Sequence, residues 1–374
     1  MKKKIKVIIS GGGTGGHIYP AISIANALKH RMDGVEILFV GAEGKMEMEK
    51  VPAAGYKIIG LPIRGLQRRL TFDNFKFFFR LFSSLRKARK VVKEFAPDAV
   101  VGVGGYASGP LLRVASRQGV PALIQEQNSY PGITNKLLAK TAKSICVAYE
   151  GMERFFPEEK IVFTGNPVRQ DLLQANSLKE EGVKHFDLDS NKKTLLVVGG
   201  SLGARTINES VLGNLDAIQK SGIQIIWQTG KFYHKEALEK TSGMDIPGLK
   251  LYDFLGRMDL AYAVADVVIS RAGAGTISEL CLVEKPCILV PSPNVAEDHQ
   301  TKNAMALVKK NAALMVKDSE AREKLVEQAL KLIHQEEKLG ELAANIAGMA
   351  MHNSAERIVD EILKMIEEKK TLDR

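Results

Sequence analysis

The stretch that decides the fold is IKVIISGGGTGGH, residues 5–17. A short β-branched run ends at five glycines in six positions, and an apolar helical pattern begins directly afterwards at Ile18. This order of strand, glycine-rich turn and helix brings backbone N–H groups and a helix N-terminus to one point, where anions bind favourably. Glycine suits the turn because a side chain would hold a phosphate away from the backbone. The stretch therefore predicts a diphosphate-binding turn.

The same glycines leave a second function class open. Gly11, Gly13 and Gly16 fit the G-x-G-x-x-G spacing of an NAD-dependent oxidoreductase, which also needs an acidic residue at the end of the second strand. Glu43 lies slightly late for that position. His17, in the first turn of the helix, is unusual in a loop that only holds a cofactor, although such a histidine can also be a helix cap or a surface residue.

Length and composition narrow the remaining classes. A chain of 374 residues with 45% hydrophobic composition suggests two domains, each with its own core. The net charge of +10 indicates an anionic partner, such as nucleic acid, a membrane surface or a phosphorylated substrate. Cys146, Cys281 and Cys287 have neither disulfide nor metal-site spacing, which is typical of a reduced cytosolic protein. No apolar run reaches the roughly 18 residues of a membrane-spanning helix. We expect residues 1–4 to lead into a first strand and not to form a targeting segment.

Apolar runs alternate with helical patterns through both halves of the chain, which predicts two doubly wound parallel sheets. In the first half we expect strands at 4–10, 36–40, 56–61, 98–103, 122–125, 144–148 and 160–163. The turn Gly165-Asn166-Pro167 ends this half. The opening pattern then recurs as KTLLVVGGSLGA at 193–204, and we expect strands at 193–198, 223–228, 250–252, 266–270 and 287–291.

Further polar or glycine-rich turns follow these strands, at the edge where ligands of parallel sheets bind. The turn at 102–109 either adds to the first site or allows tight helix–sheet packing. In the segment 271–279, Glu279 lies about one turn after the start of a helix. There it can accept hydrogen bonds from two ribose hydroxyls, or it can simply interact with the positive end of the helix dipole. The loop at 293–304 can bind sugar hydroxyls or cap a helix. No metal-ligand spacing supports a metal-dependent transfer, so we expect neither a metal nor a cofactor.

Residues 64–94 combine ten basic with two acidic residues and contain six phenylalanines. On a helix, four of these phenylalanines share one face, and three further apolar residues widen it: Phe72, Phe75, Phe79 and Phe82, with Phe78, Leu81 and Leu85. Arg80 and Arg86 are among the flanking basic residues. Such a segment suits an anionic membrane surface, at about 1 kcal/mol for each basic residue near the lipid. Core packing with a solvated basic face, and nucleic-acid binding, are the alternatives.

Seven motifs occur in an order that resembles one enzyme family: GGGTGGH (11–17), GGY (104–106), EQNSYPG (126–132), GNPVR (165–169), GGS (199–201), SRAGA (270–274) and DHQ (298–300). Over about 300 residues the chain is similar to the peptidoglycan N-acetylglucosaminyltransferases, which form lipid II. Three positions depart from the family pattern: Gln125 replaces a frequent His, Leu202 a usual Gln and Gly275 a usual Leu. A related lipid glycosyltransferase acting on diacylglycerol remains an alternative.

The resemblance implies a glycosyltransferase B fold, in which two doubly wound Rossmann-like domains face a cleft, and an inverting, metal-independent reaction. Residues 1–165 would face acceptor and membrane, residues 166–354 would bind the UDP-sugar, and a helix at about 355–374 would pack back on the first domain. The donor would be UDP-N-acetylglucosamine and the acceptor undecaprenyl-diphospho-N-acetylmuramoyl-pentapeptide, at the cytoplasmic face of the membrane. The resemblance also implies cell-wall synthesis or division proteins as partners, and no nucleic acid.

The resemblance assigns site residues as well. The donor site would comprise Arg169, Ser201, the Leu255 backbone, Ala274, Gly275, Thr276, Glu279, His299 and Gln300. The acceptor side and cleft would comprise Thr14, Gly15, Gly16, His17, Tyr106 and Asn128. Inversion needs an in-line attack by the muramoyl 4-hydroxyl on the anomeric carbon, and a base near that hydroxyl helps. A near-neutral pKa suits His17 to this role.

Overall fold

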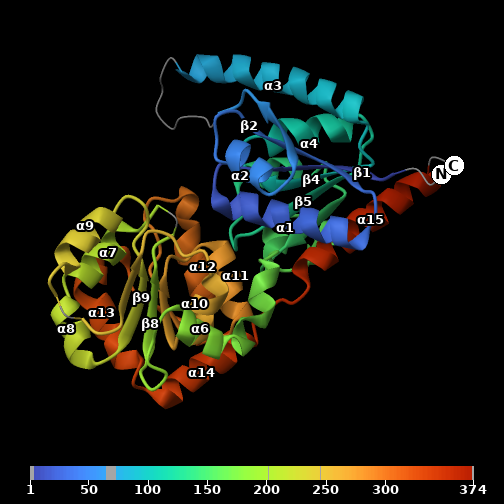
Figure 1. Cartoon of the computed structure of the whole chain (residues 1–374). Helices are drawn as coiled ribbons and strands as arrows, with labels where there is room; N and C mark the ends of the chain where they lie inside the picture. Colours follow the sequence, from blue (N-terminus) through green and yellow to red (C-terminus); the bar gives the residue numbers. More distant parts are fainter. Residues whose placement is uncertain (1–3, 65–72, 201, 245, 373–374) are drawn as a thin grey trace. The chain divides into compact units, whose positions relative to one another are not determined.

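The computed structural model describes residues 4–64, 73–200, 202–244 and 246–372, without the side chains of 73–76, 170, 171 and 296. It divides into two compact units (Figure 1). The first unit combines Met1–Val168 with His352–Arg374, and the second is Arg169–Met351. Each unit is built around one parallel sheet.

The first unit has a seven-stranded sheet in the order β3-β2-β1-β4-β5-β6-β7, and each described pair is parallel. Its strands are β1 (Lys6–Gly11), β2 (Glu36–Ala42), β3 (Lys57–Leu61), β4 (Ala99–Gly104), β5 (Ala122–Glu126), β6 (Ser144–Val147) and β7 (Ile161–Phe163). Its helices are α1 (Gly15–Arg31), α2 (Glu47–Ala53), α3 (Asp73–Phe95), α4 (Ser108–Arg117), α5 (Ile133–Leu138) and α15 (Ser354–Leu372), with 3-10 turns η1 (Met152–Arg154) and η2 (Glu158–Lys160).

Alternation along β1 explains the layers of this unit. Successive side chains of a strand point to opposite faces, so Val7 and Ile9 join the core under α1 and α15, whereas Ile8 joins the core under α3 and α4. Both faces of the sheet are therefore covered by helices (Figure 1). This explains why the strands read as continuous apolar runs.

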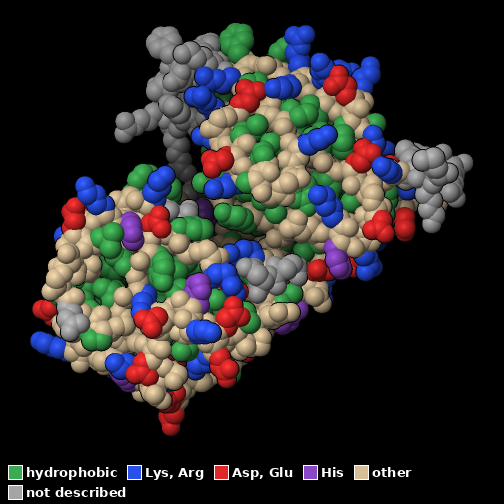
Figure 2. All heavy atoms as spheres, in the orientation of Figure 1, with side chains coloured by type: hydrophobic (Ala, Val, Ile, Leu, Met, Phe, Trp, Pro, Cys, Tyr) green, Lys and Arg blue, Asp and Glu red, His purple; other side chains and the backbone are tan. Residues whose placement is uncertain are grey.

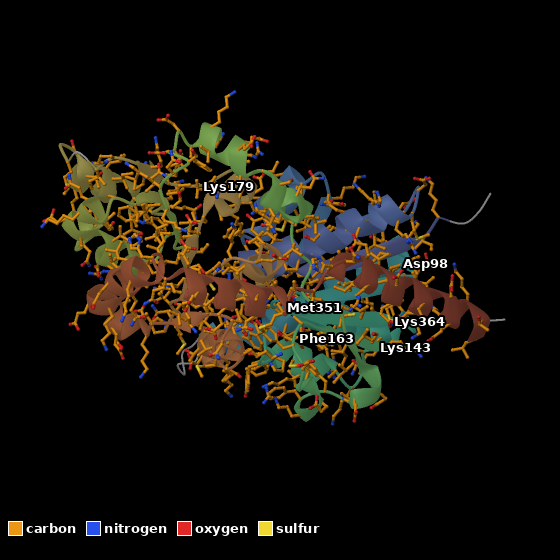
Figure 3. The ribbon with its side chains drawn as sticks, turned by 90° about the horizontal axis from the view of Figure 1, so that it is seen from below. Asp98, Lys143, Phe163, Lys179, Met351 and Lys364 are labelled. Carbon is orange, nitrogen blue, oxygen red and sulfur yellow. The ribbon has the colours of Figure 1, made fainter. Side chains whose placement is uncertain are left out.

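The last helix of the chain completes the first unit. Ile358 and Ile362 of α15 are buried in the core beside α1. At the rim, Lys143 Nζ lies 3.1 Å from Glu368 Oε2, and Arg357 donates to the Phe163 carbonyl at 3.3 Å. Figure 3 shows Lys143 and Phe163 beside this helix. The first unit is therefore discontinuous in sequence. Its two boundaries lie within three residues of those that the resemblance implies, 165/166 and 354/355.

The second unit has a six-stranded sheet in the order β10-β9-β8-β11-β12-β13, again with parallel pairs. Its strands are β8 (Thr194–Val198), β9 (Gln224–Gln228), β10 (Leu249–Tyr252), β11 (Val267–Ser270), β12 (Cys287–Leu289) and β13 (Leu314–Met315). Its helices are α6 (Lys179–His185), α7 (Arg205–Leu212), α8 (Leu215–Ser221), α9 (His234–Thr241), α10 (Met258–Val264), α11 (Ala274–Leu282), α12 (His299–Val308), α13 (Ala321–Leu332) and α14 (Glu336–Ala347). Its 3-10 turns are η3 (Gln170–Ser177), η4 (Ala296–Asp298) and η5 (Asp318–Glu320).

The two predicted sheets are confirmed, and each expected strand lies within two residues of its predicted bounds. Both sheets also have the doubly wound order, in which the chain reverses direction beside the first strand of the unit. This switch point lies between β1 and β4 in the first unit and between β8 and β11 in the second. Ligands of such sheets bind at the carboxyl ends of these strands, where the glycine-rich turns lie.

Candidate active site

The turn after β1 places His17 in the first turn of α1. Thr14 precedes the helix with extended backbone, and the His17 side chain folds back so that Nδ1 lies 2.9 Å from the Gly12 carbonyl oxygen. A carbonyl oxygen only accepts, so this hydrogen bond requires a proton on Nδ1. In the neutral ring the lone pair is then on Nε2, the nitrogen that can act as a base.

The turn after β4 packs directly on the turn after β1. Gly104 has a φ of +102°, and a Cβ there would lie 2.8 Å from His17 Nε2. Gly105 has a φ of +88°, and a Cβ there would lie 2.5 Å from the Gly12 carbonyl oxygen. At Gly102, by contrast, a Cβ would lie 2.7 Å from the Leu112 side chain of α4. Gly102 therefore permits tight helix packing, while Gly104 and Gly105 let the turn after β4 lie against Gly12 and His17.

A buried carboxylate, that of Glu126, orients the loop EQNSYPG at 126–132. Glu126, at the end of β5, accepts hydrogen bonds from the backbone of Asn128 at 3.0 Å and of Gly132 at 3.1 Å. It also accepts from the side chain of Asn135 at 2.8 Å. Gln127 donates to the Val103 carbonyl at 2.8 Å and so joins this loop to β4. Asn128 is thereby held near the carboxyl ends of β4 and β5.

Gln125 replaces the frequent family histidine without leaving its side chain unsatisfied. Its amide nitrogen donates to Asn166 Oδ1 at 2.9 Å, and Asn166 donates to the Gln127 carbonyl at 3.0 Å. All three residues are buried. Gln125 therefore belongs to a buried polar network beneath the loop.

In the second unit, Arg169 and Glu279 come from distant motifs and meet. Arg169 Nε lies 3.4 Å from Glu279 Oε1, and Tyr262 of α10 donates to Glu279 Oε2 at 3.1 Å. Burial, together with the charge of Glu279, raises the pKa of Tyr262 well above its usual value. Sequence reasoning missed Tyr262. A tyrosine in the otherwise apolar run 260–264 of α10 has a hydroxyl that needs a hydrogen-bond partner when it is buried.

The N-terminus of α11 follows the switch-point strand β11. Gly273 precedes the helix with extended backbone and caps it with no side chain, so the N–H groups of Ala274, Gly275 and Thr276 lack intrahelical partners. A Cβ on Gly275 would meet nothing within 4 Å. The turn can therefore donate hydrogen bonds to an anion, and the departure from leucine at 275 does not block it.

The remaining predicted donor residues are placed less directly. The Leu255 N–H donates to Gln228 Oε1 at 2.8 Å, so its carbonyl is the backbone group left for a ligand. Gln300 Oε1 accepts from the Ser292 N–H at 2.8 Å, and His299 begins α12. Ser201 lies outside the described residues, whereas Leu202, which follows it, is exposed.

Known proteins match this arrangement over nearly the whole chain. Residues 7–147 match the N-terminal domain of glycosyltransferase family 28, and residues 194–361 match its C-terminal domain. The chain belongs to glycosyltransferase family 28. A relative from Parabacteroides distasonis is 62% identical over 98% of this chain and 100% of its own length. A relative from Phocaeicola vulgatus is 57% identical over 98% and 97%. Both are named UDP-N-acetylglucosamine--N-acetylmuramyl-(pentapeptide) pyrophosphoryl-undecaprenol N-acetylglucosamine transferase.

A solved structure agrees with the family assignment. The crystal structure of MurG from Acinetobacter baumannii is 27% identical and has a TM-score of 0.76, covering 97% of this chain and 100% of that one. The predicted glycosyltransferase B fold is confirmed, and the chain is a glycosyltransferase. The oxidoreductase alternative is set aside. Glu43, its best acidic residue, lies directly after β2 and forms a 2.8 Å ion pair with Lys87.

The basic and aromatic segment 64–94 contains exposed phenylalanines as well as residues that pack against the core. On α3, Phe78, Phe79 and Phe82 have 67%, 76% and 61% of their surface exposed. Leu81 and Leu85, which we expect to widen this face, are partly buried and pack against the core that contains Ala88, Val91 and Val92. Arg80 is half-buried, and the Arg86 guanidinium lies 5.7 Å from the Phe82 ring centroid. Phe72 lies outside the described residues, as does the side chain of Phe75.

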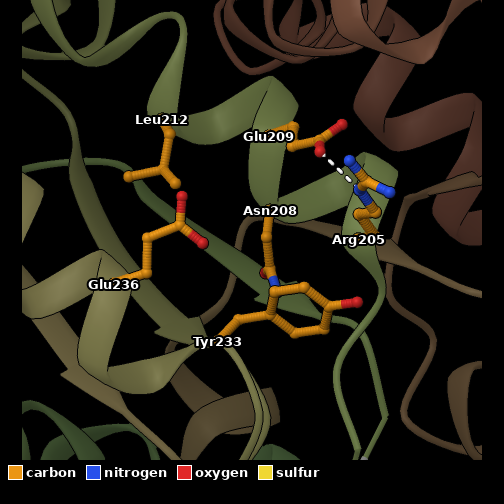
Figure 4. Close-up of a pocket in the computed structure, with 6 residues that line it drawn as sticks. All are labelled: Arg205, Asn208, Glu209, Leu212, Tyr233 and Glu236. Atoms are coloured by element: carbon orange, nitrogen blue, oxygen red, sulfur yellow. Dashed lines mark hydrogen bonds and ion pairs between the residues drawn. The ribbon is translucent and has the colours of Figure 1, made fainter.

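The second unit also contains a cavity of about 350 Å³ between α7 and α9 (Figure 4). Its lining residues are Arg205, Asn208, Glu209, Leu212, Tyr233 and Glu236. Glu209 accepts from Arg205 Nε at 2.7 Å and from Arg322 Nε at 2.6 Å, and these arginines hold its pKa below the usual value. None of the predicted site residues lines this cavity.

The expectation that the sequence holds no metal-ligand spacing overlooks one Asp-x-Asp pattern, which is the spacing of a sugar-transferase metal motif. Asp187 and Asp189 form an Asp-x-Asp pattern, but they lie before β8, at the opposite end of the strand from the glycine turns. Asp187 pairs with Lys250 at 3.0 Å, and Asp189 accepts from the Asn191 N–H at 2.9 Å. In the part of the chain that the structure describes, no three His, Cys, Asp or Glu residues are grouped as a metal site. None of the described helices is long and apolar enough to cross a membrane.

Proposed function

We propose that this enzyme transfers N-acetylglucosamine from UDP-N-acetylglucosamine to the 4-hydroxyl of undecaprenyl-diphospho-N-acetylmuramoyl-pentapeptide, with inversion, during peptidoglycan synthesis. The observation that carries the proposal is the 62% identity to a relative of that name, over 98% of this chain and 100% of the relative. The names of both relatives specify an undecaprenyl acceptor, which disfavours diacylglycerol.

The second unit supplies the groups that a UDP-sugar needs. The Glu279 carboxylate suits the two ribose hydroxyls, and its bonds to Arg169 and Tyr262 set its orientation. The first-turn N–H groups of α11 suit the diphosphate. As the bond from the anomeric carbon to the diphosphate breaks, negative charge grows on the leaving UDP, and these donors stabilise it without a metal ion.

The first unit supplies the base. In the proposed step the muramoyl 4-oxygen forms its bond to the anomeric carbon while UDP leaves from the opposite side. His17 Nε2 takes the proton of the hydroxyl, since Nδ1 is engaged with the Gly12 carbonyl. Thr14, Gly15, Gly16, Tyr106 and Asn128 surround this turn on the same sheet edge and would contact the acceptor.

We further propose that α3 attaches the enzyme to the cytoplasmic face of the membrane. Phe78, Phe79 and Phe82 expose most of their surface next to basic residues of the same helix. Figure 2 shows hydrophobic and basic side chains together along the edge that carries α3. A lipid-linked acceptor makes such a location necessary for turnover, because its diphosphate and sugar stay close to the bilayer.

A transfer assay with two donors and two acceptors tests the proposed function. Radiolabelled UDP-N-acetylglucosamine or UDP-glucose is offered with either a short-chain analogue of the muramoyl lipid or diacylglycerol in mixed micelles. Label should pass from UDP-N-acetylglucosamine to the muramoyl lipid. Preferential labelling of diacylglycerol would overturn the proposal in favour of the related lipid glycosyltransferases.

A further inference from the structure

Glu47 is a fully buried carboxylate beneath the first glycine turn, and the mechanism above does not use it. It begins α2, and none of its surface is exposed. Its Oε2 accepts from the Gly13 N–H and its Oε1 from the Ala42 N–H, both at 2.9 Å. A Cβ on Gly12 would collide with this carboxylate. One backbone N–H of the predicted diphosphate-binding turn, that of Gly13, therefore already donates to a carboxylate of the chain itself.

The peptide group between Gly12 and Gly13 connects this acid to His17. Its N–H donates to Glu47, and its carbonyl accepts from His17 Nδ1 at 2.9 Å. Both groups belong to one rigid plane, so fixing the N–H also fixes the carbonyl. Hydrogen bonds in such a chain polarise one another, and a carboxylate on the N–H makes the carbonyl a stronger acceptor.

We propose that Glu47 is a positioning residue that acts on His17 through the Gly12–Gly13 peptide. It holds the carbonyl that keeps the proton on Nδ1 and thereby leaves Nε2 as the basic nitrogen. The second glycine turn completes the arrangement, because Gly104 leaves room for the Nε2 edge of the ring. The catalytic part of this inference rests on the proposed function, whereas the tautomer part does not.

The geometry requires glutamate and no shorter or neutral side chain. Glutamine has one acceptor oxygen, and its amide nitrogen would face one of the two N–H donors. Aspartate keeps the charge but is one methylene shorter, so it cannot reach both Ala42 and Gly13. Glu47→Gln and Glu47→Asp should therefore each lose one of the two bonds while keeping a polar side chain.

The ring tautomer can be read without any activity. The protein contains seven histidines, and comparison with His17→Ala assigns the His17 signals in spectra of protein labelled with ¹⁵N-histidine. At alkaline pH, where the ring is neutral, the wild type should show the Nδ1-protonated form. Glu47→Gln and Glu47→Asp should shift the ring toward a mixture of tautomers. An unchanged tautomer in both variants would overturn the proposal.

A double-mutant cycle then tests the catalytic consequence, with Asp98→Asn as the matched control. Asp98 Oδ2 also accepts a backbone N–H of this sheet, that of Lys6 at 2.8 Å, but at the amino end of β1, away from the turns (Figure 3). Glu47→Gln should lower kcat by roughly 10- to 100-fold in wild type and hardly at all in His17→Ala. Asp98→Asn should change kcat less than about threefold in either background.

The outcomes separate the two proposals. Equal effects of Glu47→Gln in both backgrounds would mean that Glu47 does not act through His17. A wild type that transfers no sugar would overturn the proposed function, yet the tautomer measurement would still be informative. If Glu47→Gln does not fold, Glu47→Asp serves in the same cycle, since it retains the buried charge.

Discussion

Arg169 Nε and Glu279 Oε1 lie 3.4 Å apart in the second unit, although one residue follows the interdomain turn and the other lies in α11. Tyr262 binds the other oxygen of the same carboxylate. A carboxylate held on both oxygens has a fixed orientation but keeps further lone pairs for a ligand. This arrangement is the basis for the proposal that Glu279 accepts hydrogen bonds from the donor's hydroxyls.

Glu279→Ala should raise the KM for UDP-N-acetylglucosamine by roughly 10- to 100-fold, because charge-assisted hydrogen bonds worth about 1.5–3 kcal/mol are lost. The acceptor KM should change little. Steady-state kinetics with each substrate varied in turn provide the measurement. A donor KM equal to that of wild type would return Glu279 to a purely structural role.

Tyr262→Phe should have a smaller effect on the donor KM than Glu279→Ala. It removes only the hydroxyl that donates to Glu279, so the donor KM should rise about fivefold, as expected for one hydrogen bond of about 1 kcal/mol. An effect as large as that of Glu279→Ala would show that the tyrosine does more than orient the carboxylate.

His17→Ala should lower kcat by about 10²- to 10⁴-fold, the usual range for the loss of a general base. The donor KM should stay within a few-fold of wild type, because the donor groups belong to the other unit. Should the acceptor KM rise while kcat is preserved, His17 would only shape the turn.

Replacing Phe78, Phe79 and Phe82 by serine should release the enzyme from anionic vesicles. Burial of each phenylalanine side chain is worth about 1.5–3 kcal/mol. High salt should release the wild type only partly, since the apolar contribution is not screened. Turnover of a short-chain, water-soluble acceptor should survive. The control is Phe232→Ser, which removes an equally exposed phenylalanine from the second unit and should leave vesicle binding intact.

Two results would contradict the membrane interpretation. If the triple variant sediments with vesicles as the wild type does, α3 is not the attachment surface. If only Phe232→Ser is released, attachment belongs to the second unit.

EDTA should leave transfer activity intact, and UDP-N-acetylglucosamine should raise the melting temperature in its presence. The physical reason is that the first-turn N–H groups of α11 are proposed to stabilise the negative charge of the diphosphate. Complete inhibition by EDTA that Mg²⁺ or Mn²⁺ reverses would remove this metal-free mechanism.

The sheets could be predicted because their strands are buried on both faces and end at glycine turns. β13 was missed since Leu314 and Met315 form too short a run to show a period. The side of α3 that meets the core could not be predicted, because its exposed phenylalanines adjoin Leu81 and Leu85, which pack against the core. Helical periodicity shows which residues share a face, but not which face meets the sheet.

The site was predictable as far as local motifs reach. His17, Glu279 and the α11 turn belong to patterns of contiguous residues, and the structure places them at the two switch points. Glu47 and Tyr262 have no such pattern, because an acidic residue opening a short helix and a tyrosine in an apolar helix are both common. The roles that we propose for them rest on their contacts in the folded structure.

The measurement that tests the account most directly is the structure of the product made from UDP-N-acetylglucosamine and the short-chain muramoyl lipid. Nuclear magnetic resonance spectra of the isolated product report both the anomeric configuration and the hydroxyl that carries the new sugar. We predict N-acetylglucosamine in β configuration on the 4-oxygen of the muramoyl residue, with one UDP released for each linkage. Retention of the α configuration, linkage to another hydroxyl, or UDP release without a new linkage would contradict the account.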